Sequence, residues 1–262
     1  LTSPFLENTM QLTGNTLLIT GGASGIGRGL AEAFHRLGNQ VIIAGRRKAL
    51  LDEVVRANPG MDAVELDITD PAQIQQVAQA LIAKYPALNV VVNNAGVMPF
   101  DDAAGALDDA QAVRLVETNL LGPVRLSAAF IGHLRQQPRA TLIHNSSVLA
   151  FVPLASTALY SATKAALHSY ALSQRFTLRD TSVEVLEIAP PWVDTDLIHK
   201  SGDPRAMPLD QFIAEIMAKL PEARTEVLVD AALPMRANPG PQEHALVNGF
   251  NEALVAHPIP VA

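Results

Sequence analysis

One stretch decides the fold of this chain: Thr16-Leu17-Leu18-Ile19-Thr20-Gly21-Gly22-Ala23-Ser24-Gly25-Ile26-Gly27. Its first residues are continuously apolar, which is typical of a strand buried on both faces of a sheet. The residues after Gly27 have the period of a helix. Glycines between a strand and a helix let the backbone turn tightly, and the free N–H groups at the helix start can bind an anion such as a phosphate.

The alternation of apolar strands and helical segments continues along the chain. Strands are predicted at residues 16–20, 40–44, 63–66, 90–93, 140–145 and 183–188. Helices are predicted at residues 26–37, 48–57, 71–84, 110–134 and 159–178. Parallel strands joined by crossover helices have this order. The predicted fold is therefore α/β, a single Rossmann-type doubly wound parallel sheet with helices on both faces.

The pattern loosens after residue 188. Polar, glycine and proline residues dominate 194–208, and an amphipathic stretch follows at 209–220. We expect residues 194–220 to form a small helical lid over a substrate. A last helical stretch, Gln242 to Val255, has no role that the sequence assigns. Residues 1–9 share no pattern with the rest, and we expect an artificial remnant or disordered extension ahead of a single domain at 10–262.

The composition excludes several classes of function. The chain has 262 residues with 48% hydrophobic and 17% charged residues, which is enough apolar material for a globular core. A net charge of -7 argues against nucleic acid as a partner, since such binding needs clustered Lys and Arg. No apolar run reaches the roughly 18 residues that span a bilayer, and no secretion signal is visible. We expect no membrane association and a cytoplasmic location, which the absence of cysteine also fits.

The sequence also predicts no metal site. Without cysteine the chain has no thiolate nucleophile and no Cys-ligated metal centre. Its seven histidines are scattered and show no spacing that is typical of metal ligands.

The second predicted strand ends in Ala44-Gly45-Arg46-Arg47. In dinucleotide sites an acidic residue at this point binds the adenosine ribose of NAD(H). Two guanidinium groups would instead bind a 2'-phosphate in forked, charge-assisted geometry. The sequence therefore favours NADP(H), with NAD(H) as the alternative. Another interpretation is that Arg46 and Arg47 are only solvent-exposed charges at the start of the next helix and bind no ligand.

Tyr160 and Lys164 are four residues apart on a predicted helix, and therefore on the same face. A nearby cation favours the phenolate form of tyrosine, which suits proton transfer. On its own this spacing is more typical of a surface pair. Ser147 follows the predicted strand 140–145, and ligands of a parallel sheet collect at the carboxyl ends of strands. Ser147 could also simply cap the segment that follows it.

Several motifs together resemble the short-chain dehydrogenase/reductase family across residues 12–195. They are T-G-x-x-x-G-x-G at Thr20–Gly27, Asn93-Asn94-Ala95-Gly96, Asn119, Ser147 and Tyr160-x-x-x-Lys164. The segments 12–16, 165–169 and 178–185 further resemble the branch named for D-alanine esterification of lipoteichoic acid. That branch name does not establish a reaction.

The resemblance implies roles for individual residues. The catalytic residues would be Asn119, Ser147, Tyr160 and Lys164, with Asn119 holding a water link to Lys164. Asp67 and Ile68 would contact the adenine, and Thr195 would lie near the nicotinamide carboxamide. The full set of cofactor contacts would be Gly21, Ser24, Gly25, Ile26, Gly27, Arg46, Arg47, Asp67, Ile68, Asn94, Ala95, Gly96, Tyr160, Lys164, Val193 and Thr195.

Two further expectations come from the resemblance. Pro191 stands where the family usually has glycine, so the local backbone path and a nicotinamide contact are expected to differ, because proline fixes φ and lacks an N–H. The segments 110–134 and 159–178 resemble the helices through which family members pair. This implies a homodimer or homotetramer.

The predicted function is an NADP(H)-preferring oxidoreductase that reversibly reduces a ketone or aldehyde to an alcohol. Tyr160 would be the general acid/base, Ser147 would steady the oxyanion, and Lys164 would lower the pKa of Tyr160 and bind the ribose. A hydrophobic substrate is expected to be flanked by Val97, Met98, Leu149, Phe151, Leu154 and Trp192. The main alternative is a catalytically silent cofactor-binding sensor or scaffold, which would tend to lack Tyr or Lys. The other is a sugar-nucleotide epimerase or dehydratase, whose chains generally run longer.

Overall fold

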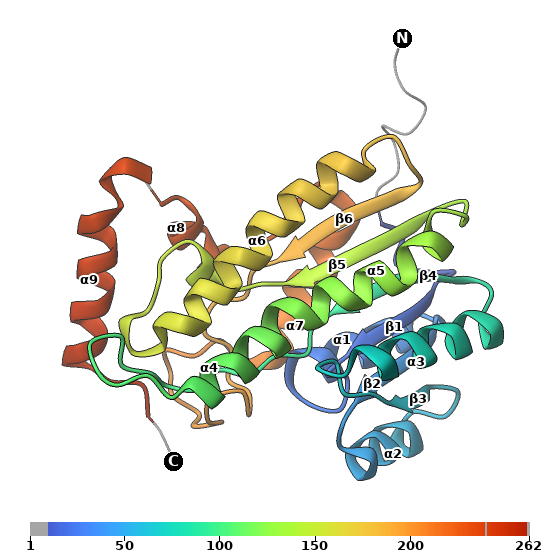
Figure 1. Cartoon of the computed structure of the whole chain (residues 1–262), viewed down its shortest axis with the longest axis horizontal. Helices are drawn as coiled ribbons and strands as arrows, with labels where there is room; N and C mark the ends of the chain where they lie inside the picture. The colour runs from blue at the N-terminus through green and yellow to red at the C-terminus, as the bar shows by residue number, and fades with distance from the viewer. Residues whose placement is uncertain (1–9, 239, 261–262) are drawn as a thin grey trace.

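The computed structural model describes residues 10–238 and 240–260, so the expectation for residues 1–9 lies outside the described residues. The described residues form one seven-stranded parallel sheet in the order β3-β2-β1-β4-β5-β6-β7, shown in Figure 1. The strands are β1 (Thr16–Thr20), β2 (Gln40–Gly45), β3 (Asp62–Glu65), β4 (Leu88–Asn93), β5 (Ala140–Asn145), β6 (Val183–Ile188) and β7 (Glu226–Val227). The predicted doubly wound α/β fold is confirmed.

Helices cover both faces of the sheet. Their bounds are α1 (Gly25–Arg36), α2 (Lys48–Ala57), α3 (Pro71–Lys84), α4 (Asp109–Val116), α5 (Gly122–Leu134), α6 (Ala158–Leu178), α7 (Leu209–Lys219), α8 (Leu233–Arg236) and α9 (Glu243–Ala256). One apolar core joins the sheet to α1, α2 and α7, and a second joins it to α3, α5 and α6. Ile19 of β1 belongs to the first core and Leu18 to the second, because successive side chains of a strand point to opposite faces. The continuous apolar run of β1 is therefore buried on both sides, as predicted.

The structure adds the four-residue helix α8, which was not predicted, and differs from the prediction in two other elements. The helix expected over residues 110–134 is divided into α4 and α5 by a π-helical turn at Glu117–Leu121. Strand β7 was not predicted, because its two residues are too few to produce a periodic pattern.

The C-terminal part of the chain lies beyond the carboxyl end of the sheet. In Figure 1 the arrows of β5 and β6 point toward the side of the molecule where α8 and α9 stand, and α4 reaches the same side. The stretch that had no assigned role, Gln242 to Val255, forms most of α9. Across residues 10–238 and 240–260, no helix combines the length and apolarity needed to cross a membrane.

Candidate active site

A cleft with a volume of about 1010 Å³ lies at the carboxyl ends of the strands. Its walls come from the residues that follow β1 to β6, together with parts of α4, α6 and the C-terminal segment. The volume is at the upper end of what is usual for ligand pockets, about 300 to 1000 Å³. All the predicted cofactor residues line this cleft except Gly27, and Ser147 lines it with Tyr160 and Lys164. The cleft therefore brings together motifs from six separate parts of the sequence.

The glycine-rich turn leaves room for a ligand at the start of α1. Gly21 has a φ of 67°, a conformation that side chains other than glycine rarely adopt. Helix α1 begins at Gly25. The Ser24 side chain forms no capping hydrogen bond with it, so the first backbone N–H groups of the helix have no side-chain partner and can bind a ligand. Gly27 lies behind the turn: a Cβ there would approach both Gly21 O and Asn94 Nδ2 to 2.4 Å. The absence of a side chain at Gly27 therefore allows α1 to pack closely against the turn.

The ends of β1, β4 and β5 are joined by side-chain hydrogen bonds. Thr20 Oγ1 accepts from the backbone N–H groups of Asn94 at 3.0 Å and Ala95 at 3.1 Å. Asn94 Nδ2 donates to Thr20 O at 2.9 Å, and Asn145 Nδ2 donates to Asn94 Oδ1 at 2.8 Å. These contacts fix the floor of the cleft between the glycine turn and the strand that leads to Ser147.

Arg46 and Arg47 lie exposed on the rim of the cleft at the end of β2. Arg47 Nη2 donates to Ser24 Oγ at 2.9 Å, which connects the β2–α2 loop to the glycine turn. Within residues 10–238 and 240–260, neither guanidinium forms an ion pair with a carboxylate. Both remain available to an anionic ligand. Asp67, also in the wall, is turned inward, since its Oδ1 accepts from the N–H and hydroxyl of Thr69.

These features fit a dinucleotide cofactor. The glycine cradle has no side chains in the way, the first N–H groups of α1 have no side-chain cap, and two guanidinium groups lie on the rim. Asn145 Oδ1 also lies buried in the cleft wall without a hydrogen-bond partner. An unpaired buried oxygen of this kind is a site that a ligand hydroxyl can satisfy.

Tyr160 and Lys164 of α6 are both buried and both face the cleft. Lys164 Nζ lies 5.5 Å from the centroid of the Tyr160 ring and donates to the backbone oxygen of Asn145 at 2.8 Å. Burial raises the pKa of the Tyr160 phenol above its usual range, and a hydrogen bond with Ser147 opposes this shift. Burial lowers the pKa of Lys164 to about 8, and the negative charge of Glu187 opposes that shift. At neutral pH the pair is a protonated phenol beside an ammonium group.

Ser147 has two hydrogen-bonding roles. Its Oγ accepts from Leu149 N at 3.1 Å and so caps the short turn Val148–Ala150, which is the capping role considered from the sequence. Its hydroxyl also lies near Tyr160, where it lowers the pKa of the phenol, and it lines the cleft. The two interpretations are therefore compatible.

Asn119 lies in the π-helical turn and is buried just behind the cleft wall. Its side chain accepts from Val97 N at 2.9 Å and donates to Val97 O at 2.8 Å. Asn119 thus fixes the backbone of the loop that follows β4, opposite Lys164. The water link that the family resemblance implies stays a prediction.

The loop after β6 forms another wall of the cleft. Pro190 O accepts from Val148 N at 3.0 Å, and Pro191, Trp192, Val193 and Thr195 line the cleft. The backbone of Trp192 and Asp194 is bonded to that of Met207, so this loop has a fixed partner in the segment before α7. In the described residues every non-glycine φ is negative, so the chain passes Pro191 without a left-handed conformation.

Five of the six apolar residues expected near the substrate line the cleft: Val97, Met98, Leu149, Leu154 and Trp192. Phe151 does not, and this expectation is wrong. Its ring packs edge to face against His168, with the centroids 5.0 Å apart, and the Arg236 guanidinium lies 4.7 Å above it. The reason is that Phe151 ends the turn Val148–Ala150 and is drawn into a small apolar cluster with α9.

Sequence reasoning missed the apolar residues that the C-terminal part supplies. These residues lie between the segment just before α7 and the end of the described chain, and they line the cleft: Met207, Met235, Phe250, Leu254 and Ile259. In α9, Phe250 and Leu254 are four residues apart and so share one face of the helix. That spacing was visible in the sequence, but nothing in it indicated which surface the face would cover.

Comparison with known proteins agrees with this architecture. The family model described as short chain dehydrogenase matches residues 15–206. A relative in Bacillus subtilis, the uncharacterized oxidoreductase DltE, is 42% identical over 224 residues, which are 83% of this chain and 89% of that protein. An NADPH-dependent 1-acyldihydroxyacetone phosphate reductase of Schizosaccharomyces pombe is 33% identical over 187 residues, 70% of this chain and 62% of that protein.

Among solved structures, a short chain dehydrogenase from Burkholderia cenocepacia in complex with NADP is similar. It superposes with a TM-score of 0.80 at 26% identity, covering 96% of this chain and all of that chain. The similarity therefore extends over the whole sheet and its helices.

Proposed function

The chain belongs to the short-chain dehydrogenase family, and from this premise we propose that it is an NADP(H)-preferring oxidoreductase that reversibly reduces a hydrophobic ketone or aldehyde to an alcohol. One observation carries the proposal. Ser147, Tyr160 and Lys164 face one cleft, with the Ser147 hydroxyl close enough to the Tyr160 phenol to act on its pKa and the Lys164 amine 5.5 Å from the centroid of the Tyr160 ring. The glycine turn opens into the same cleft.

In this proposal the bound cofactor supplies the hydride. Burial keeps the Tyr160 phenol protonated at neutral pH, so it can donate a proton to a carbonyl oxygen as reduction proceeds. The Ser147 hydroxyl bonds to the same oxygen and stabilises its developing negative charge. In alcohol oxidation the roles reverse, and Tyr160 acts as the base.

Lys164 supports the charge that Tyr160 acquires. With a pKa of about 8 its amine is mostly protonated at neutral pH, and a cation close to the phenolate stabilises it after the proton has left. The bond to Asn145 O holds the amine in place, and its remaining N–H groups are assigned to the cofactor ribose. Asn119 is assigned to the water link behind Lys164.

The preference for NADP(H) rests on Arg46 and Arg47. Both stand at the end of β2, where no carboxylate of the described residues pairs with them, and the first three residues after the strand are all basic. Guanidinium groups bind phosphate in a forked geometry, whereas a ribose 2'-hydroxyl would call for an acceptor. The NADPH-dependent yeast relative and the NADP complex from Burkholderia cenocepacia support the same choice.

The substrate is proposed to be an apolar carbonyl compound. The far end of the cleft is walled by Met, Leu, Phe and Ile side chains of the C-terminal part and by Trp192. Of the segment 194–220, the part before α7 is proposed to cover this end, because Leu197, Ile198 and Met207 line the cleft while α7 packs against α1. The yeast relative is named for a substrate with an acyl group, which supports a substrate with a long apolar portion.

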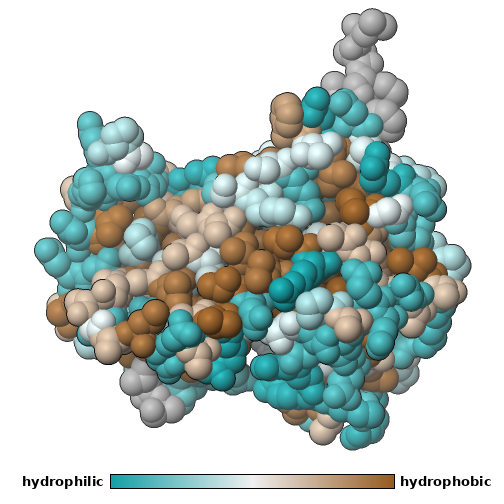
Figure 2. Space-filling view, in the orientation of Figure 1, coloured by the Kyte–Doolittle hydropathy of each residue, from teal (hydrophilic) through white to brown (hydrophobic). Residues whose placement is uncertain are grey.

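We also propose that the chain forms a homodimer or homotetramer through α5 and α6. Leu172 and Phe176 of α6 are 47% and 68% exposed, which is unusual for large apolar side chains. Figure 2 shows hydrophobic residues gathered across the middle of the face on which these helices lie. Burial of that band against a second copy would remove apolar surface from water.

The test is NADPH consumption with a panel of aromatic and aliphatic ketones and aldehydes, in the wild type and in Tyr160→Phe. The variant keeps the ring but loses the proton donor, so turnover should fall by about 100-fold to 10,000-fold with folding intact. Tyr170→Phe is the matched control: Tyr170 is on the same helix α6 but does not line the cleft. Wild-type turnover in Tyr160→Phe would refute the assigned role. Silence of the wild type across the panel with tight NADPH binding would favour the sensor alternative.

A further inference from the structure

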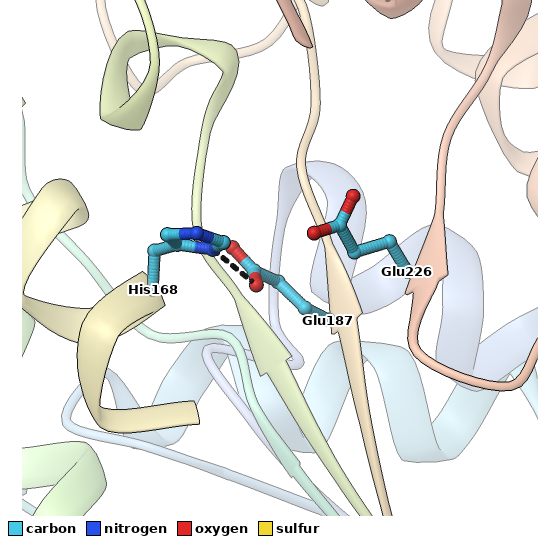
Figure 3. A group of neighbouring side chains, drawn as sticks. All are labelled: His168, Glu187 and Glu226. Carbon is cyan, nitrogen blue, oxygen red and sulfur yellow. Dashed lines mark hydrogen bonds and ion pairs between the residues drawn. The ribbon is translucent and has the colours of Figure 1, made fainter. Parts of the chain in front are cut away.

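A group of ionisable side chains lies beside the cleft, outside the residues assigned above. Figure 3 shows that Glu187 of β6 extends toward His168 of α6, while Glu226 of β7 points toward β6 from the other side. The ligand atoms of the three residues lie within 4.8 Å of one another. His168 is largely buried and Glu187 is fully buried, so the group belongs to the protein interior.

This group is a closed hydrogen-bond network rather than a vacant metal site. Arg236 binds both oxygens of Glu226, at 2.7 Å and 2.9 Å. The two oxygens of Glu187 accept from Ser146 Oγ at 2.5 Å and pair with His168 Nδ1 at 2.7 Å. Each carboxylate oxygen already has a protein partner, and the Arg236 cation pairs with Glu226. The question is therefore what the buried Glu187 carboxylate does for the cleft.

The first partner of Glu187 is the residue immediately before Ser147. Ser146 is held on its backbone as well, since its N–H donates to Ile188 O at 2.8 Å. Ser147 is extended, with φ of -171° and ψ of 156°. Successive side chains of an extended chain point to opposite sides, so binding of Ser146 on the Glu187 side directs Ser147 toward the cleft.

The second partner lies one helical turn beyond Lys164. His168 and Lys164 are four residues apart on α6 and therefore share a face. Lys164 Nζ is bonded to Asn145 O of β5, and His168 to Glu187 of β6. Helix α6 is thus attached to the sheet at two successive turns, through Lys164 itself and through His168 one turn further on.

From these contacts we propose that Glu187 is a positioning residue of the oxidoreductase: through Ser146 and His168 it sets the Ser147 hydroxyl and the Lys164 amine in place beside Tyr160. The proposal rests on the proposed function. Burial of a carboxylate is costly unless its hydrogen-bond and ionic partners are well placed. A fully buried glutamate that is bonded to the neighbours of two cleft residues therefore has a specific structural use.

The charge of Glu187 also acts on Lys164, because it raises a pKa that burial lowers to about 8. Replacement by glutamine should therefore lower the pKa of Lys164 further. Other charged or titratable groups face Glu187 and would respond as well: His144 of β5, His168 and Arg175 of α6, Glu226 of β7 and Arg236 of α8.

The test compares Glu187→Gln with Glu184→Gln, a control on the same strand whose side chain belongs neither to this network nor to the cleft wall. The measurements are kcat, KM, melting temperature and NADPH affinity from about pH 6 to about pH 10, which covers both sides of the Lys164 pKa of about 8 and ends near the ordinary lysine value. Glu187→Gln should lower kcat by about tenfold to a hundredfold, as expected when a reacting group is misplaced. The pH at which NADPH affinity declines should also move down, and Glu184→Gln should change neither.

Glu187→Asp separates charge from position. Aspartate keeps the negative charge but is one methylene shorter and cannot hold both partners, so kcat should fall while the pH dependence of NADPH affinity stays that of the wild type. The proposal is overturned if Glu187→Gln keeps wild-type kcat and pH dependence, or if its loss of kcat follows only a lower melting temperature without a shift in the pH dependence. If the wild type reduces no carbonyl compound, the proposed function fails. In that case the NADPH affinities, which are measured without substrate, still test whether Glu187 acts on Lys164. If Glu187→Gln leaves the pH dependence of NADPH affinity unchanged, the proposal is overturned.

Discussion

Replacement of Gly27 by alanine tests the close packing on which the cofactor end of the cleft is built. A Cβ at this position would lie 2.4 Å from both Gly21 O and Asn94 Nδ2. Neither neighbour can withdraw easily, since one is backbone and the other is bonded to Thr20 O at 2.9 Å. The added methyl must therefore push α1 away from the glycine turn or break the bonds that join β1, β4 and β5.

The size of the effect follows from that overlap. Overpacking of a tight interior costs about 1 to 3 kcal/mol, and two immobile neighbours favour the upper end. For a chain of this size about 3 kcal/mol corresponds to a fall in melting temperature of about 6 to 12 °C. NADPH affinity should fall as well, because Gly21 and Asn94 both line the cleft.

Gly132→Ala is the matched control, since it makes the same chemical change in a place with open space. Gly132 lies in the last turn of α5, and a Cβ there meets nothing within 4 Å. Alanine in a helix is favoured over glycine by about 0.5 to 1 kcal/mol, so this variant should melt slightly higher than the wild type. Both are measured by thermal unfolding and NADPH titration. A Gly27→Ala protein as stable as the wild type, with unchanged NADPH affinity, would refute the description of the turn.

Three other perturbations address the cofactor, the proton and the substrate. In a variant that carries both Arg46→Ala and Arg47→Ala, the ratio of kcat/KM for NADPH to kcat/KM for NADH should fall by about tenfold or more, because only NADPH has the 2'-phosphate that the guanidinium groups bind. Equal losses for both cofactors would contradict this. Because the pKa of Lys164 is about 8, kcat/KM for reduction should fall as the pH rises through that value, and in Lys164→Arg the fall should disappear, since arginine stays protonated. Phe250→Ala should raise KM for bulky apolar carbonyl compounds and leave NADPH affinity unchanged, which a substrate series with increasing chain length would measure.

The sequence predicts most of the sheet because its strands carry a strong local signal. The bounds of β1, β5 and β6 are those expected from their apolar runs. The π-helical turn between α4 and α5 could not be predicted in this way, since its residues suit an ordinary helix. What accompanies the turn in the structure is a long-range contact, the pairing of Asn119 with the backbone of Val97.

The candidate site shows the same division. Tyr160 and Lys164 could be placed together because a four-residue spacing on a helix determines their relative positions. Phe151 was misplaced because its direction depends on α8 and α9, far along the chain. Nothing in the sequence indicated that Glu187 lies beside the cleft. Glu184 and Glu187 both belong to the strand Val183–Ile188, yet Glu184 is partly exposed and Glu187 is fully buried. Only the pairing of β6 with its neighbours and with α6 distinguishes the two.

The origin of the cleft walls explains why reaction and substrate are unequally predictable. The cofactor end and the proton-transfer residues all come from the part of the chain that matches the family model, residues 15–206. The apolar end comes largely from residues beyond that match, from Met207 to Ile259. Backbone turns and a Tyr–Lys pair can serve one hydride-transfer chemistry with many substrates, because they contact only the cofactor and the carbonyl group. Substrate choice then depends on the side chains of α8, α9 and the segment after them, so variants in this C-terminal part, rather than family membership, should determine which substrate the protein accepts.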